Sequence, residues 1–216
     1  MRRQLRLSLL GAMGALLVPF VDATEIRSPG RQLVRFLDSL QVEERWIAGA
    51  HVDWRTGEPD GRPVSDTGVH SHCSALVATA CERLGVYILR PPEHPQTLLA
   101  NAQCDWLLER GATEGWTPVS GAAEAQSAAN RGKLVVAVYR NSKSRKPGHI
   151  AIVRPSDRSE ESVRQDGPEV IQAGQENYAS VPLKVGFRHH PDAWKRSEVR
   201  FFAHEISWER QTARER

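Results

Sequence analysis

The hydrophobic pattern changes period near residue 130, and this change limits the folds open to the chain. Before it, apolar residues recur at helical spacing after Ser28-Pro29 and again from Cys73 to about Arg83. After it come short apolar runs typical of buried strands, at 134–139, 149–153 and 169–173. Short connections between these runs favour antiparallel hairpins. The order predicts an α+β domain with N-terminal helices packed on one side of an antiparallel β-sheet.

Further helices and strands are expected outside these segments. We expect helices over 95–111 and 120–130, and strands over 181–187 and 199–206. Gly85 suits the C-terminal cap of the helix that begins at Cys73. Trp194, shortly after Pro191, indicates a short helix at the sheet edge, and the loop before Cys73 is long enough to suggest a functional role.

The first 23 residues have the composition of a secretory signal peptide. Three arginines precede an apolar stretch from Leu7 to Val21, and Val21-Asp22-Ala23 provides a small-residue cleavage site. The alternative is an uncleaved membrane anchor, but the stretch is short against the roughly twenty apolar residues of a spanning helix. We therefore expect an exported protein, periplasmic or extracellular, with no stable membrane span once the leader is cleaved.

The charge balance argues against nucleic-acid binding. Loss of the leader removes three arginines and Asp22, which leaves 26 basic and 25 acidic residues. A nearly neutral protein lacks the basic surplus on which phosphate binding depends. The basic run 143–146 is interpreted as a solvated hairpin loop.

The chain has three cysteines, and an odd number in an exported protein suggests one disulfide and one free thiol. If Cys73 is the reactive thiol, Cys81 and Cys104 are the natural pair, joining two helices. The alternative is that both are small buried core residues.

A cysteine and a histidine occupy positions suited to nucleophilic catalysis. Cys73 begins a predicted helix, where the helix dipole lowers the pKa of a thiol. His149 begins an apolar strand about seventy-five residues later. Catalytic cysteine and histidine residues are usually distant in sequence and adjacent in the fold. This pair predicts acyl transfer by a thiol nucleophile with an imidazole base.

These segments resemble the NlpC-type cell-wall peptidases, compact papain-like enzymes related to the CHAP amidohydrolases. The resemblance covers residues 68–206 and is carried by Cys73-Ser74-Ala75-Leu76-Val77, Gly148-His149-Ile150-Ala151-Ile152-Val153 and Val170-Ile171-Gln172-Ala173-Gly174. It implies a papain-like domain in which Cys73 is the nucleophile, His149 the base and Gln172 the residue that orients the imidazole. Asn177 is the rival orienting residue or a substrate contact. No cofactor is implied.

Other residues near this motif are candidate substrate contacts. Many members of the family have aspartate before the cysteine, where this chain has His72, and an oxyanion-hole tyrosine for which Trp54 and Ser71 are the nearby candidates. Trp54 is also a candidate for stacking on sugar rings. A zinc site is not expected, because His70, His72 and Cys73 match no structural zinc pattern. The pair His189-His190 is interpreted as a loop feature.

Together these features predict a signal peptide at 1–23, a helix and loop at 24–67, a papain-like cysteine hydrolase domain at 68–206 and a charged tail at 207–216. The expected activity is cleavage of amide bonds, with the peptide stem of peptidoglycan as the substrate. Two alternatives remain open at this point. One is a non-catalytic module that binds cell-wall peptides, and the other is a secreted effector amidase with another substrate.

Overall fold

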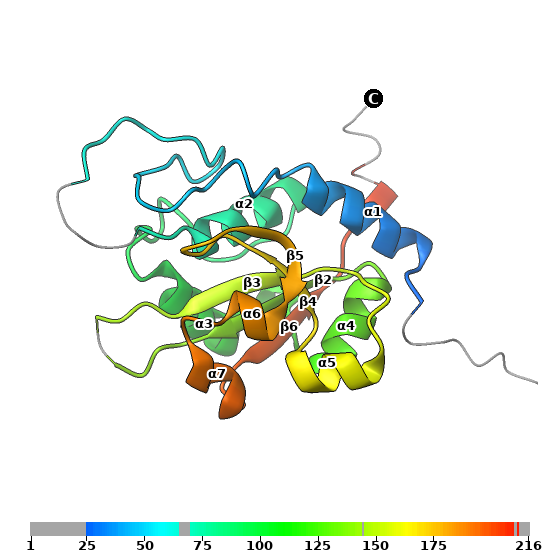
Figure 1. Cartoon of the computed structure of the whole chain (residues 1–216). Helices are drawn as coiled ribbons and strands as arrows, with labels where there is room; N and C mark the ends of the chain where they lie inside the picture. Colours follow the sequence, from blue (N-terminus) through cyan, green and yellow to red (C-terminus); the bar gives the residue numbers. More distant parts are fainter. Residues whose placement is uncertain (1–24, 65–69, 144, 210, 212–216) are drawn as a thin grey trace, which may run out of the picture.

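A computed structural model describes residues 25–64, 70–143, 145–209 and 211. The predicted signal peptide, and most of the charged tail, lie outside these described residues. The chain forms helices and one antiparallel sheet (Figure 1), which confirms the α+β class. Within the described ranges, no helix is both long and apolar enough to cross a bilayer.

Three helices dominate the first half of the chain. They are α1 (Ser28–Asp38), α2 (Cys73–Leu84) and α3 (Leu99–Glu109), followed by the short 3-10 helix η1 (Gly111–Glu114). The prediction for α2 is confirmed: Cys73 is its first residue, and Gly85 ends it in the left-handed region with φ of 69°. The helix expected over 95–111 begins later than predicted, because Leu98 adopts a positive φ of 56° before it.

Six strands form a single sheet in the order β1-β6-β2-β3-β4-β5. Every neighbouring pair is antiparallel. The strands are β1 (Thr117–Val119), β2 (Leu134–Tyr139), β3 (His149–Val153), β4 (Glu169–Gln172), β5 (Tyr178–Pro182) and β6 (Arg200–His204). The predicted hairpin between the second and third of these is confirmed, with Tyr139 opposite His149.

Helices cover both faces of the sheet, so the expectation of helices on one side was wrong. Alternation along each strand sends Ile150 and Ile152 toward α2, while Ala151 and Val153 face the opposite layer. That layer contains α4 (Ala122–Asn130), α5 (Glu160–Asp166), α6 (Leu183–Gly186) and α7 (Pro191–Lys195). Because both faces are covered, the central strands β2 and β3 are almost entirely buried.

The strand expected over 181–187 was also wrong. The chain leaves β5 at Pro182 and turns into α6, and the Phe187 N–H donates to the Leu183 carbonyl at 2.8 Å. Leu183 and Phe187 are four residues apart and both are fully buried, whereas Val185 is 39% exposed. Burial at a spacing of four is a helical pattern, and it places Phe187 beside the first residue of β3.

Candidate active site

The Cys73 thiol lies at the N-terminus of α2, against the start of β3. Hydrogen bonds from the backbone N–H groups of Ile150, Ser74 and Cys73 lower the pKa of this thiol, but its burial outweighs them and raises the pKa above the ordinary value. Only 5% of the residue is exposed. The expectation of a thiol pKa lowered by the helix terminus is therefore corrected, since desolvation of the thiolate exceeds the dipole effect.

A chain of hydrogen bonds fixes the orientation of His149. Its Nε2 lies 2.5 Å from the side-chain oxygen of Gln172 on β4. The Gln172 amide nitrogen in turn donates to the Glu176 carbonyl at 2.7 Å. A backbone carbonyl can only accept a hydrogen bond, so the Gln172 amide nitrogen faces Glu176 and the amide oxygen faces His149. The three residues that these two hydrogen bonds join lie on β3, on β4 and in the turn that follows β4.

This chain selects one tautomer of the imidazole. The Gln172 oxygen can only accept, so His149 Nε2 carries the proton and Nδ1 keeps its lone pair. No described residue forms a hydrogen bond to Nδ1. A neutral imidazole with an unoccupied Nδ1 lone pair is the form that can accept a proton from a thiol.

Two aromatic rings enclose His149 on its other sides. Phe187 meets it edge-to-face at 4.7 Å between centroids, and the His190 ring stacks at 5.8 Å with an interplanar angle of 26°. Burial, followed by the positive charge of His190, lowers the pKa of His149 to about 3, although the hydrogen bond that His149 donates to Gln172 acts in the opposite direction. His149 is therefore neutral over the ordinary range of pH.

The nucleophile and base candidates both lie at the start of β3 but pack on different faces of the sheet. Cys73 belongs to the same hydrophobic cluster as Ile150, whereas the His149 ring contacts Phe187 of the opposite cluster. The described residues include no direct hydrogen bond between the Cys73 thiol and the His149 ring. The resting arrangement is thus a buried neutral thiol against Ile150 and, on the preceding residue of β3, an oriented neutral imidazole that packs on the opposite face of the sheet.

The predicted substrate contacts beside the cysteine occupy different environments. Ser71 is exposed, whereas His72 is buried and its Nε2 lies 2.9 Å from the Ala50 carbonyl. Burial lowers the pKa of His72, so this ring stays neutral as well. His72 connects the N-terminus of α2 to the preceding loop, which is a structural role, and leaves Ser71 as the accessible member of the pair.

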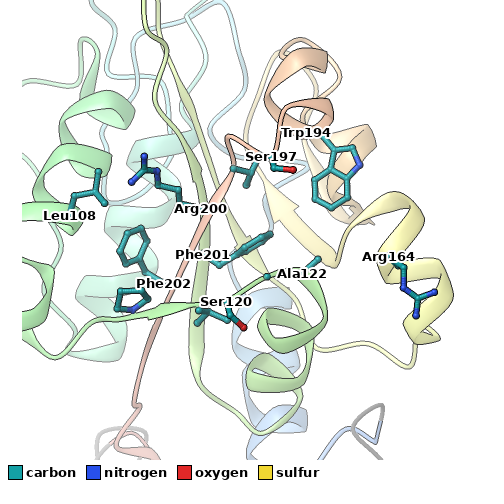
Figure 2. A pocket seen from close by; sticks show the side chains of 13 residues that line it. Leu108, Ser120, Ala122, Arg164, Trp194, Ser197, Arg200, Phe201 and Phe202 are labelled. Carbon is teal, nitrogen blue, oxygen red and sulfur yellow. The ribbon is translucent and has the colours of Figure 1, made fainter.

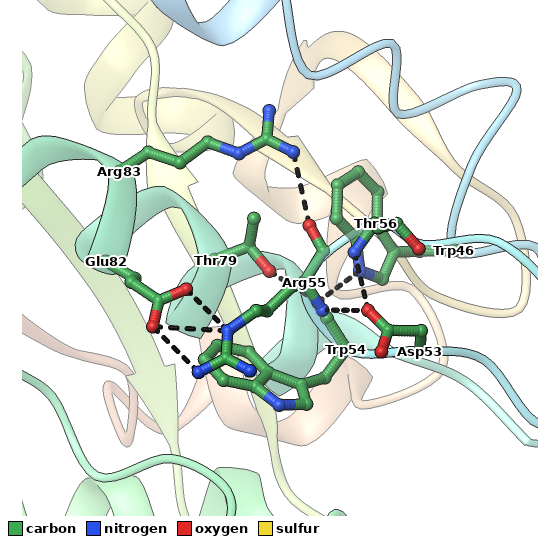
Figure 3. Close-up of polar contacts among 8 residues, drawn as sticks. All are labelled: Trp46, Asp53, Trp54, Arg55, Thr56, Thr79, Glu82 and Arg83. Carbon is green, nitrogen blue, oxygen red and sulfur yellow. Dashed lines mark hydrogen bonds and ion pairs between the residues drawn. The ribbon is translucent and has the colours of Figure 1, made fainter. Parts of the chain in front are cut away.

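Trp54 is part of the core rather than a free stacking surface. Trp54 is 8% exposed, and the Arg55 guanidinium lies over its ring, 4.5 Å from the ring centroid. Its backbone carbonyl accepts hydrogen bonds from Thr79 and from the Trp46 indole (Figure 3). Arg55 is itself held by Glu82 of α2 at 3.0 Å. These contacts fasten the loop to α2 and leave the Trp54 ring unsuited to stacking on a sugar.

Asn177 fastens another loop. Its amide nitrogen donates to the carbonyls of Val42, Arg45 and Trp46, at 2.7, 2.8 and 3.3 Å. Its oxygen accepts from the Gly174 N–H at 3.1 Å. All of these partners are backbone groups, and Gln172 is the residue that bonds to His149. Asn177 is therefore the structural link between residues 42–46 and the β4–β5 turn.

The predicted disulfide between Cys81 and Cys104 is not formed. All three cysteines are free and buried. Cys81 is fully buried and Cys104 is 1% exposed, both within the cluster under α2 and α3. They fill small spaces between the helices, which is the alternative that the sequence left open.

A cavity of about 530 Å³ lies elsewhere on the surface of the described residues. Figure 2 shows that it lies beside β6, with Phe201 and Trp194 on one side and Leu108 and Arg200 on the other. Neither Cys73 nor His149 lines it. No group of three or more His, Cys, Asp or Glu side chains in the described ranges is arranged to hold a metal ion.

Three contributors to this site were missed from the sequence. Phe187 had been assigned to a strand, His190 to a loop feature, and Glu176 acts through its backbone carbonyl. The only available signal was the position of the histidine pair directly before Pro191, which begins α7. Neither a scan against protein-family models nor a search of curated proteins finds a match for this chain.

Proposed function

We propose that this protein is an exported cysteine hydrolase that cleaves amide bonds, with peptidoglycan stem peptides as the substrate class. The observation that carries the proposal is the Gln172–His149 hydrogen bond, which leaves the Nδ1 lone pair of His149 available. The next residue, Ile150, has a backbone N–H that acts to lower the pKa of the Cys73 thiol. A nucleophile, a base and a residue that orients the base are the minimum set for acyl transfer by a thiol.

The arrangement of elements supports a papain-like domain of the NlpC type. A helix that begins at Cys73 packs on an antiparallel sheet, the third strand after that helix begins at His149, and Gln172 ends the strand beside it. This order agrees with the resemblance in the sequence. The proposed family therefore rests on the order of the elements and on three residues.

The proposed reaction proceeds in two steps. The Cys73 thiol transfers its proton to His149 Nδ1 as the sulfur bonds to the substrate carbonyl carbon, and the imidazolium then protonates the leaving amine, so that a thioester forms. Water then gives a proton to His149 and its oxygen to the thioester, which releases the acid and restores the thiol. Backbone N–H groups at the start of α2 are the candidates for stabilising the oxyanion.

Proton transfer requires Nδ1 to face the thiol, so the buried resting pair must approach each other when substrate binds. A raised thiol pKa also favours one alternative: a non-catalytic module that binds cell-wall peptides and keeps Cys73 for packing. A secreted effector amidase that acts on another substrate uses the same chemistry and differs only in the peptide that it accepts.

The test is incubation of the protein with purified peptidoglycan, followed by mass analysis of the released fragments. Wild type and Cys81→Ala should release new fragments, and Cys73→Ala should release none, since Cys81 is a buried thiol on the same helix and serves as the matched control. Fragments from Cys73→Ala would disprove the thiol mechanism. No release from wild type, with Cys73 alkylated no faster than a free thiol, would favour the binding module. No release with a fast-reacting Cys73 would favour another substrate.

A further inference from the structure

The segment between α6 and α7 forms the part of the candidate site that the proposed reaction does not use. Phe187 and His190 come from this segment, and both rings contact His149. A third histidine, His189, lies between them and is exposed, with Arg188 donating to its ring at 3.5 Å. Two neighbouring histidines of different burial therefore stand beside the proposed base.

Backbone hydrogen bonds hold His190 in place. Its N–H donates to the Phe187 carbonyl at 2.7 Å, and its own carbonyl accepts from the Ala193 N–H at 3.0 Å, at the start of α7. The half-buried ring lies against Tyr139 at 5.3 Å and against His149 at 5.8 Å. Since Tyr139 and His149 are cross-strand partners, the ring spans the ends of β2 and β3.

The groups around His190 offer it little compensation for a positive charge. From β3 it faces His149, from β2 the Tyr139 ring, and from its own segment His189. The nearby carboxylates, Glu198 and Asp192, join burial in raising the pKa of the Tyr139 hydroxyl. No carboxylate pairs with His190 among the described residues. Burial, and then the charge of His189, lower the pKa of His190.

We propose that His190 is a positioning residue that keeps His149 aligned and unprotonated as the pH falls, which extends the base form of His149 to lower pH. Two stacked imidazoles, one buried and one half-buried, cannot readily hold a positive charge each. At this separation the repulsion is worth roughly one to two pH units at an effective dielectric constant of about 20 to 40. The inference rests on the proposed function in taking His149 as the base.

The test compares wild type, His190→Gln and His189→Gln in the full chain. The first readout is the titration of the His149 ring by NMR, and the second is the rate of Cys73 alkylation by iodoacetamide between about pH 2 and 8. In His190→Gln the His149 titration should move up by about one pH unit. The acid limb of alkylation should move up with it. His189→Gln is the matched control, and because that ring is exposed it should shift both readouts much less.

The two readouts separate this inference from the proposed function. An unchanged His149 titration in His190→Gln, in a protein that keeps its native NMR spectrum, would overturn the inference. An equal shift in His189→Gln would also overturn it, because general surface charge would then explain both. Alkylation that is the same in His149→Gln as in wild type would contradict the proposed function, while the His149 titration would still report on the contact with His190.

Discussion

The Glu176 carbonyl accepts a hydrogen bond from the Gln172 side chain and so determines which ring nitrogen of His149 is protonated. The two residues are separated by one turn, with the amide nitrogen 2.7 Å from the carbonyl oxygen. Arg188 pairs with the Glu176 carboxylate, so the segment that contacts the other side of the His149 ring also holds this turn. The tautomer of the proposed base therefore depends on a backbone group outside the motif.

Replacing Gln172 tests this dependence. Gln172→Leu keeps the volume but removes the acceptor, so His149 Nε2 loses its partner and the tautomer is no longer fixed. Loss of a buried hydrogen bond costs about 1.5 to 3 kcal/mol, which corresponds to roughly a 10- to 100-fold slower alkylation of Cys73. Gln175→Leu, an exposed position in the same turn, should react at the wild-type rate. Equal rates in both variants would mean that Gln172 does not act on the base.

Stability should fall in acid because His149 is buried in its neutral form. Its pKa drops from 6.5 to about 3 on folding, so the unfolded chain binds a proton that the folded chain does not. The stability that the buried neutral His149 provides is fully present above pH 6.5 and is lost as the pH falls from 6.5 toward 3. At about pH 5 the loss from this residue is about 2 kcal/mol.

Urea unfolding at about pH 7.5 and 5 measures this loss. Wild type should lose more unfolding free energy between the two values than His149→Gln does, and the exposed His189→Gln should follow wild type. Burial also lowers the pKa values of His72 and His190, so some acid sensitivity should remain in His149→Gln. Identical losses in wild type and His149→Gln would show that His149 titrates normally in the folded protein.

Asn177 should matter for stability rather than for chemistry. Its amide serves three carbonyls of residues 42–46, so Asn177→Ala leaves several partly buried acceptors without a donor. We expect a decrease of about 2 to 3 kcal/mol in the free energy of unfolding. Gln175→Ala in the same turn should change it by less than about 0.5 kcal/mol. A stable Asn177→Ala protein with lost activity would instead restore Asn177 as a substrate contact.

Substitutions at two glycines distinguish the energetic cost of backbone strain from the cost of a side-chain clash. Gly57 and Gly85 both have positive φ, of 76° and 69°. A Cβ added at Gly57 would lie 2.5 Å from the Trp46 ring, whereas at Gly85 it would meet nothing within 4 Å. Gly85→Ala should cost about 1 to 2 kcal/mol from strain alone. Gly57→Ala should cost roughly 1 to 3 kcal/mol more. Equal losses in thermal unfolding would mean that the Trp46 ring can move aside.

The sequence was sufficient where local chemistry decides the structure. Cys73 and Gly85 mark the ends of α2 because a helix favours a left-handed glycine after its last turn. The strands β2 and β3 follow from their continuous apolar runs. In contrast, Val181, Leu183, Val185 and Phe187 alternate as a strand would, and only packing against the sheet shows that Leu183 and Phe187 share a helical face.

One contact of the candidate site was predictable from the sequence, but several of its members and its electrostatics were not. The motif identified Cys73, His149 and Gln172, and the Gln172–His149 hydrogen bond agrees with the expected roles. The depth of burial that raises the thiol pKa depends on which layers cover the sheet, and no local pattern encodes that. The contact between His149 and His190 depends in the same way on the path of the chain through α6 and α7.

The Asn177 link has a consequence for the order of folding. It joins residues separated by 135 positions along the chain, and β1 reaches β6 across a gap of comparable scale, from Thr117 to Ala203. Contacts between residues so distant in sequence form late and slow the folding of a domain. During synthesis, residues 42–46 therefore remain without this partner until Asn177 has emerged. The segment that follows α1 is thus completed only when most of the chain is present.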